Sequence, residues 1–201
     1  MLGYVLNANP EKKMATVNQS APNITLKKRA RLFFLIVPTI FLADYFTKHL
    51  VKRAMVPYEE TIPVIDGLVK LRFIYNEGIA FGINLVFIPG WLLILISCSI
   101  AILIIVYIFF SHYGDLVGLV ALCLIAGGAI GNLFDRIAYG RVIDFIEIGI
   151  NDLTWPVFNV ADISVTCGAI LLALHLFFHK PGAAGLESSK TSGQPSPTKR
   201  S

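Results

Sequence analysis

Long apolar stretches alternate with short polar segments along this chain, and the pattern predicts its main elements. Residues 85–110 contain no Asp, Glu, Lys or Arg over 26 positions, and residues 116–134 contain none over 19. At about 1.5 Å per helical residue, either stretch is long enough to cross roughly 30 Å of hydrocarbon. Residues 32–51 and 157–178 are also mostly apolar, although each includes a few polar side chains. We therefore predict four membrane-spanning helices, with a tight turn at residues 111–115 between the second and the third.

A different periodicity occurs in the polar segments. Residues 69–75, VKLRFIY, alternate apolar and polar side chains, which favours a half-buried strand. Residues 141–150, RVIDFIEIGI, show a second alternating pattern, and Pro57, Pro63 and Asp66-Gly67 are typical of turns. The predicted fold is an all-α membrane bundle of four transmembrane helices, with a small extracytoplasmic β platform between helices 1 and 2.

Composition and charge place the chain in the membrane. It is 55% hydrophobic and 15% charged, with a mean hydropathy of +0.69, which excludes an ordinary soluble globular protein. Basic residues are frequent before the first span and after the last, so we expect both termini to be cytoplasmic. The net charge is +4, but the basic residues form no helical face with interleaved aromatic residues, so no nucleic-acid partner is expected.

The ends differ in composition from the centre. Residues 1–30 are mostly polar and are predicted to be a flexible cytoplasmic tail. Residues 181–201 are rich in Ser, Pro, Gly and Lys, and such a segment is expected to be disordered. One membrane domain, residues 31–180, lies between the two tails.

Polar side chains inside the spans are the candidate functional residues, because a charge near hydrocarbon is costly. Asp44 and Lys48 are four residues apart in the first span, as in a helical ion pair. The pair could take part in the function of the site, or it could be a purely structural ion pair at the helix end. Asn132, Asp135 and Arg136 lie on one helical face at the end of the third span. Gly127, Gly128 and Gly131, just before them, favour close helix packing.

Asp144 and Asp162 are the candidates for acid–base chemistry. If both lie at the same membrane face, two carboxyls in a site of low dielectric would share one proton. Such a pair can activate water and protonate a leaving amide. In the alternative interpretation, Asp144 is a solvated strand residue and Asp162 is an acid at a helix N-terminus. Spacing along the chain leaves both interpretations open.

Other chemistries have weaker support. Asn76, after the first predicted strand, is suited either to holding a substrate backbone or to capping a turn. The four histidines are scattered without close metal-ligating partners, and no nucleophile–base pair is present, so neither a metal nor another cofactor is expected.

Five motifs in order resemble the bacterial lipoprotein signal peptidases, also called signal peptidase II. They are DYFTK (44–48), NEGIAFG (76–82), GGAIGNLFDR (127–136), RVIDF (141–145) and FNVAD (158–162). The resemblance covers residues 31–180, and the two tails extend beyond the family core.

The resemblance implies an intramembrane aspartic endopeptidase, a hydrolase of the bacterial inner membrane with its active site near the outer face. It implies removal of the signal peptide from diacylglyceryl-modified prolipoproteins just before the lipidated cysteine, and inhibition by globomycin-type peptides. The catalytic pair maps onto Asp144 and Asp162. Supporting or substrate-binding residues map onto Asp44, Lys48, Asn76, Gly78, Asn132, Asp135, Arg136 and Asn159. We expect a monomer surrounded by membrane lipid.

Two other classes of protein are alternatives to a protease. A small carrier or lipid-binding protein would use the buried acids and Lys48 to bind or relay ions. Such transporters often show an internal repeat, and none is evident in this sequence. In a non-catalytic structural subunit, so regular a set of polar motifs would have no role.

Overall fold

A computed structural model describes residues 24–78, 89–111, 115–150 and 153–178 of the chain. Its described part contains four helices long and apolar enough to cross a membrane. They are α1 (Leu26–Ala54), α2 (Gly90–Phe110), α3 (Leu116–Tyr139) and α4 (Val160–Phe178). The predicted bundle of four spans is therefore confirmed. The turn predicted at residues 111–115 falls largely outside the described residues, as do the beginning of the second predicted span and most of both tails.

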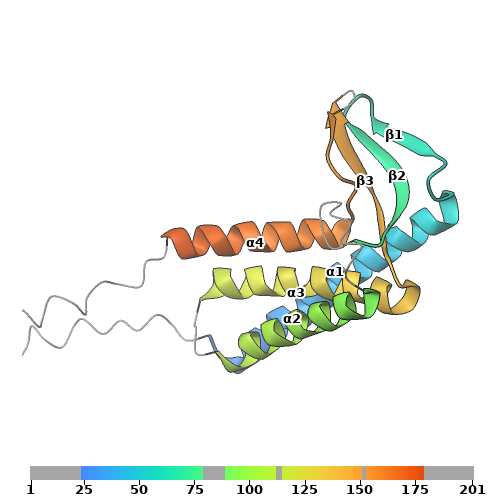
Figure 1. Ribbon diagram of the computed structural model, residues 1–201. Coiled ribbons are helices and arrows are strands. Elements are labelled where there is room, and N and C mark those ends of the chain that lie inside the picture. The colour runs from blue at the N-terminus through green and yellow to red at the C-terminus, as the bar shows by residue number, and fades with distance from the viewer. Residues whose placement is uncertain (1–23, 79–88, 112–114, 151–152, 179–201) are drawn as a thin grey trace, which may run out of the picture.

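α1 begins earlier than the sequence indicates. Residues 26–30, which the composition places in the N-terminal tail, form its first turns, and the Thr25 side chain accepts a hydrogen bond from the Lys28 backbone N–H. With 29 residues, α1 is about 43 Å long at 1.5 Å per residue, so it is longer than the hydrocarbon it crosses. It projects toward the sheet at one end of the bundle (Figure 1).

α3 is the central helix and packs against α1, α2 and α4. Small residues permit this close approach. A Cβ added to Gly168 of α4 would lie 2.7 Å from the Ala121 carbonyl oxygen of α3, and one added to Gly131 would lie 2.7 Å from Asp44 Oδ2 of α1. The glycines of both helices thus let atoms of the neighbouring helix lie close to the backbone, as predicted for the small residues of the third span.

The sheet has four antiparallel strands in the order β1-β2-β3-β4. They are β1 (Thr61–Ile65), β2 (Val69–Asn76), β3 (Val142–Ile150) and β4 (Leu153–Thr154). The two alternating segments are confirmed as β2 and β3. The sheet draws on the connection between α3 and α4 as well as the one between α1 and α2, so it is more than the predicted platform between helices 1 and 2.

The sequence pattern does not reveal β1, because Pro63 is typical of a turn. Pro63 instead lies inside β1, at an irregularity of its register with β2. β1 is at the edge of the sheet, where a residue without a backbone N–H is tolerated. The turn at Asp66-Gly67 is confirmed, with Gly67 at a φ of +73°.

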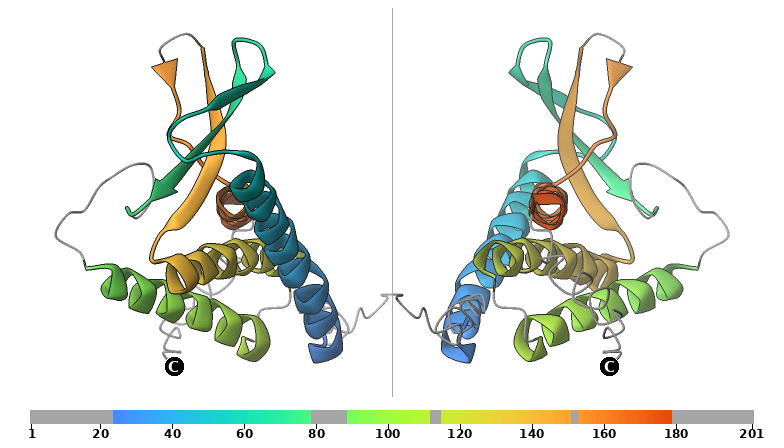
Figure 2. Two further views of the ribbon diagram at one scale, coloured as in Figure 1. Left: turned by 90° about the vertical axis from the view of Figure 1, so that its right-hand side faces the viewer. Right: turned by 90° about the vertical axis from the view of Figure 1, so that its left-hand side faces the viewer.

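Two local features bring the sheet against the helices. Gly140 ends α3 in the left-handed conformation at a φ of 72°, which glycine adopts without a Cβ penalty, and β3 starts two residues later. The backbone before α4 pairs with β3, since Phe158 N donates to Ile146 O at 3.0 Å and Ile146 N donates to Phe158 O at 2.8 Å. In Figure 2, α4 is seen end-on at the foot of the sheet.

Candidate active site

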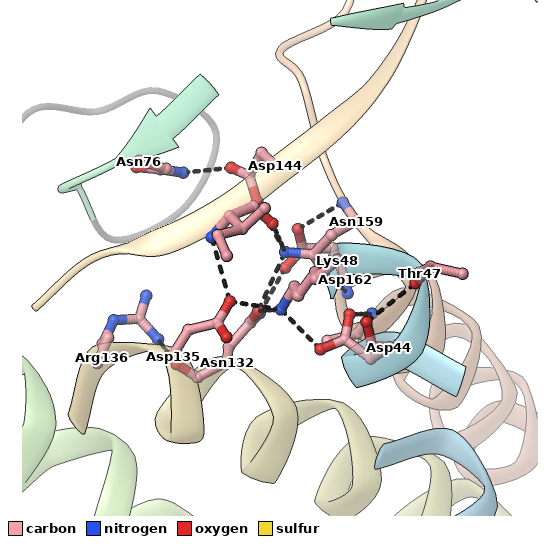
Figure 3. A network of polar contacts seen from close by, with 12 residues as sticks. Asp44, Thr47, Lys48, Asn76, Asn132, Asp135, Arg136, Asp144, Asn159 and Asp162 are labelled. Atoms are coloured by element: carbon pink, nitrogen blue, oxygen red, sulfur yellow. Dashed lines mark hydrogen bonds and ion pairs between the residues drawn. The ribbon is translucent and has the colours of Figure 1, made fainter. Parts of the chain in front are cut away.

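Asp144 and Asp162 lie in the same cavity. Asp144 is on β3 and Asp162 is in the first turn of α4, and the cavity has a volume of about 480 Å³. Its polar lining also includes Asn76, Asn132 and Arg136. The remaining lining is largely apolar and runs from Trp155 to Cys167, along the start of α4. The two carboxylates, which are far apart in the sequence, are therefore brought together at the boundary between the sheet and the helices (Figure 3).

Asn159 connects the two carboxylates. Its side-chain Nδ2 donates to Asp144 Oδ1 at 2.7 Å, while its backbone N–H donates to Asp162 Oδ2 at 3.1 Å. In return, the Asp162 backbone N–H donates to Asn159 Oδ1 at 2.9 Å. This reciprocal pair is a capping box built from Asn and Asp at the N-terminus of α4. Asn159 thus lies just before the helix, and one residue both caps α4 and binds each carboxylate.

The two carboxylate oxygens of Asp162 have different partners. Oδ2 accepts the capping bond, and Oδ1 accepts from Asn132 Nδ2 at 2.7 Å. The helix dipole also favours a negative charge in this first turn. Asp162 is therefore both an acid at a helix N-terminus and a member of the carboxyl pair, so the two interpretations do not exclude each other.

Asp144 is almost completely buried, with 1% of its surface exposed. Burial raises the pKa of its carboxyl to about 6, and the neighbouring charge of Asp162 contributes in the same direction. Hydrogen bonds from the amides of Asn76, at 2.8 Å, and Asn159 act in the opposite direction. Asp144 accordingly keeps its proton to a higher pH than an exposed aspartate.

Asn76 is held in position by its own loop. The Gly78 backbone N–H donates to Asn76 Oδ1 at 2.8 Å, which leaves the amide nitrogen directed at Asp144 Oδ2. The register of the sheet supports this contact, because Asn76 pairs with Val142 and Ile74 pairs with Asp144. Of the two roles considered for Asn76, the structure shows the turn cap, through the Gly78 N–H. The bond from its amide nitrogen to Asp144 is an additional contact that the sequence did not indicate.

Beneath the carboxyl pair lies a buried ion cluster around Lys48. Its ammonium is 2.6 Å from Asp44 Oδ2 and 2.9 Å from Asp135 Oδ2, and it donates to Asn132 Oδ1 at 3.1 Å. Asp44, Lys48 and Asp135 have exposed fractions of 1%, 2% and 3%. Three acceptors surround the three ammonium protons, so the cation is fully paired.

This cluster also anchors backbone from two other elements. Asp135 Oδ2 accepts from the Ile143 N–H at 3.1 Å, next to Asp144, and Asp44 Oδ1 accepts from the Ala161 N–H at 2.9 Å, next to Asp162. The ion cluster therefore holds the backbone neighbours of both cavity carboxylates. A change in the cluster would be transmitted to their positions.

All ten residues singled out from the sequence belong to one connected region. Arg136 lines the cavity and donates to the Asn132 carbonyl oxygen over a long 3.4 Å contact. Among the described residues, no buried side-chain N or O atom lacks a hydrogen-bond partner, and no group of three or more His, Cys, Asp or Glu residues is arranged to hold a metal ion.

Sequence reasoning missed the apolar wall of the cavity. It includes Trp155, Phe158 and Val165, which look like ordinary hydrophobic residues near a helix start. Their place in the wall depends on the pairing of the segment before α4 with β3. The only sequence feature that could have indicated their place in the cavity wall is their closeness to Asp162 along the chain.

Residues 36–178 match the family described as signal peptidase (SPase) II. The chain belongs to the signal peptidase II family. It is 40% identical over 164 residues to the lipoprotein signal peptidase of Aquifex aeolicus (strain VF5), covering 80% of this chain and 95% of the relative. It is 35% identical over 157 residues to that of Pelodictyon phaeoclathratiforme (strain DSM 5477 / BU-1), covering 74% and 90%.

A solved structure also resembles this chain. A protein described as a bacterial membrane enzyme, solved by the in meso method at 1.9 Å resolution, matches with a TM-score of 0.67 at 27% identity. The match covers 81% of this chain and all of the other. The resemblance found in the five motifs is thus confirmed, and this signal peptidase II family member is a bacterial membrane protein of a protease family.

Proposed function

We propose that this signal peptidase II family member is an intramembrane aspartic endopeptidase. It removes the signal peptide from diacylglyceryl-modified prolipoproteins just before the lipidated cysteine, with Asp144 and Asp162 as its catalytic pair. Many relatives bear the name lipoprotein signal peptidase. The observation that carries the aspartic mechanism is the convergence of these two carboxyls, joined by Asn159, in one cavity.

The environments of the two carboxyls suit different roles. Asp144, with its raised pKa, enters the reaction protonated and donates a hydrogen bond to the scissile carbonyl oxygen. Asp162, held by amide donors, enters as the carboxylate and takes a proton from water. The water oxygen bonds to the carbonyl carbon as the proton of Asp144 moves to the carbonyl oxygen. Asp162 then passes the proton it took from water to the amide nitrogen, and the C–N bond breaks. The new carboxyl group returns a proton to Asp144, and the amine leaves.

The surrounding residues act as positioning residues in this proposal. Asn76, Asn132 and Asn159 orient the carboxyls, and Gly78 fixes Asn76. The Asp44–Lys48–Asp135 cluster holds the backbone on either side of the site. Arg136, at the cavity wall, is placed to bind a polar part of the substrate.

The position of the cavity suits a lipid-anchored substrate. Its lining continues from the carboxyls along α4 to Cys167, so acyl chains and an apolar signal peptide can stay in the hydrocarbon. The described residues contain four spans, so the start of α1 and the end of α4 would face the same side of the membrane. We assign that side to the cytoplasm and the sheet to the outer face. A monomer contains every residue this reaction needs.

Cleavage of a synthetic prolipoprotein peptide tests the activity directly. The full chain, purified in detergent with added lipid, should cut a diacylglyceryl peptide before the modified cysteine, as identified by mass spectrometry. It should leave the matched unlipidated peptide intact and should be blocked by globomycin. Equal cleavage of both peptides, or a product cut at another bond, would contradict the proposed substrate class.

A further inference from the structure

A second hollow lies beside the catalytic cavity. It has a volume of about 500 Å³, and we call it the Tyr58 hollow after the residue in its wall. Asn76, Pro156 and Val157 line both spaces, so the two meet at the amide that binds Asp144. An extended chain crossing the carboxyl pair can therefore run from one space into the other.

The two spaces differ in their relation to the membrane helices. The catalytic cavity is lined by α3 and α4 as far as Cys167, whereas none of the described residues lining the Tyr58 hollow belongs to a spanning helix. Glu77, whose side chain is 74% exposed, lies in the wall of the hollow. The hollow is thus on the aqueous side of the reaction centre.

We propose that the Tyr58 hollow is the subsite for the residues that follow the lipidated cysteine, and that Tyr58 and Glu77 determine which residues it accepts. This inference rests on the proposed function. Of the substrate's three parts, the signal peptide and the diacylglyceryl group are apolar and belong in lipid. The mature polypeptide is the hydrophilic part, so it alone suits a space outside the spanning helices.

The wall at Tyr58 is fixed in place by hydrogen bonds. Its phenolic O–H donates to Tyr75 O at 3.0 Å, and the phenolic oxygen accepts from the Tyr75 N–H at 3.2 Å. The backbone N–H of Tyr58 donates to Phe73 O at 2.9 Å. The pairing of β1 with β2 reaches only as far as Thr61 and Arg72. Tyr58 thus takes the place of a strand partner at the end of β2.

The backbone of Tyr58 supports a specific role. Its φ of 66° makes it the one non-glycine residue with a positive φ in the described ranges. A bulky side chain rarely adopts this conformation, and such outliers gather at functional sites. A ring held this way gives the hollow a set width, so it should discriminate substrates by side-chain size.

Glu77 adds a charge to the same hollow. Its partner Arg141 is 3.9 Å away, and that guanidinium also stacks 3.7 Å from the centre of the Tyr75 ring. The long, exposed ion pair leaves the Glu77 carboxylate accessible to a basic side chain of the substrate. We expect a salt-sensitive preference for Lys over Asp among the first residues of the mature chain.

The test compares lipopeptides that differ only at the first and second residues after the lipidated cysteine. For the wild type, kcat/KM should be higher with Ala than with Trp, and Tyr58→Ala should reduce this ratio about tenfold. Tyr139→Ala, which changes a tyrosine that packs on Lys52 outside the hollow, is the matched control and should leave the ratio unchanged. An Ala-to-Trp ratio that stays within about twofold of wild type in Tyr58→Ala overturns the size assignment.

Glu77→Lys gives a second, independent test of the subsite. Because the Glu77 side chain is exposed, this variant should fold even if Tyr58→Ala does not. It should lower the ratio of kcat/KM for Lys to that for Asp peptides by about fivefold, an effect that high salt weakens. Unchanged charge selectivity would overturn the subsite. Wild type should cut the lipopeptide with Ala after the lipidated cysteine in either case. If the proposed function itself fails, wild type cuts none of the peptides, so the two failures can be told apart.

Discussion

Replacing Asp144 with Asn should change how the stability of the protein depends on pH. The native carboxyl has a pKa of about 6, against an ordinary value of 3.8, because it is buried and faces Asp162. Between these pH values the folded state binds more protons than the unfolded state. The folding free energy of the wild type therefore becomes less favourable as the pH rises through this window. The asparagine side chain carries no ionisable group, so the contribution disappears in the variant.

The size of the effect follows from the shift. A difference of about two pKa units corresponds to about 3 kcal/mol between pH below 4 and pH above 6. For a chain of this length, that amounts to roughly 6–12 °C in Tm. Asn76 and Asn159 donate to different oxygens of Asp144, and Asp144→Asn replaces one of these acceptors with an NH2 donor. Losing one such bond costs about 1–2 kcal/mol at every pH. The pH dependence of the difference, rather than its value at one pH, is the diagnostic quantity.

The assay is thermal unfolding of both proteins in the same detergent at intervals from about pH 4 to about pH 7, which brackets the two pKa values. The Tm of Asp144→Asn minus that of wild type should increase across this range and level off above about pH 6. Asp66→Asn, in the exposed turn between β1 and β2, is the matched control and should show no such trend. A difference that stays flat with pH would refute the raised pKa and, with it, the protonated role given to Asp144.

Three further predictions concern the same site. Lys48→Met leaves the carboxylates of Asp44 and Asp135 buried without their cation, which should destabilise the protein by about 3–5 kcal/mol and abolish cleavage; a Tm within about 2 °C of wild type, roughly the effect of 1 kcal/mol or less, would contradict this. Gly131→Ala places a Cβ 2.7 Å from Asp44 Oδ2, so it should lower both Tm and kcat, whereas Gly90→Ala, with nothing within 4 Å, should change neither. Because Asp144 must be protonated, kcat/KM should fall about tenfold per pH unit above about pH 6, and a rate that rises there would reverse the assigned roles.

The sequence predicts the spans well because their signal is local. A run such as residues 116–134, free of charge, is enough to indicate a membrane helix without knowledge of its neighbours. β2 is predictable for the same reason, from the alternation of residues 69–75. β1 gives no such pattern: all five of its residues are exposed, and it contains a proline, so its pairing with β2 defines it.

The active site is harder to predict because its contacts are long-range. The spacing of Asp144 and Asp162 leaves two interpretations open, and the decisive feature is the pairing of Phe158 with Ile146, which brings the start of α4 to β3. The helical repeat indicates the Asp44–Lys48 pair, whereas it gives no sign that Asp135 takes part. The contact between His175 Nε2 and Asp115 Oδ2, 2.9 Å long, joins residues distant in sequence and was missed for the same reason.

The most direct test of the proposed catalytic pair is cleavage of the diacylglyceryl peptide by Asp144→Asn and Asp162→Asn beside wild type and Asp66→Asn. All four proteins are first shown to be folded by their thermal transitions in detergent. We predict that wild type and Asp66→Asn cut before the lipidated cysteine, while each site variant loses at least about a thousandfold in kcat, as expected when a member of a concerted catalytic unit is removed. Substantial turnover by either folded site variant would contradict the central claim that these two carboxyls perform the reaction.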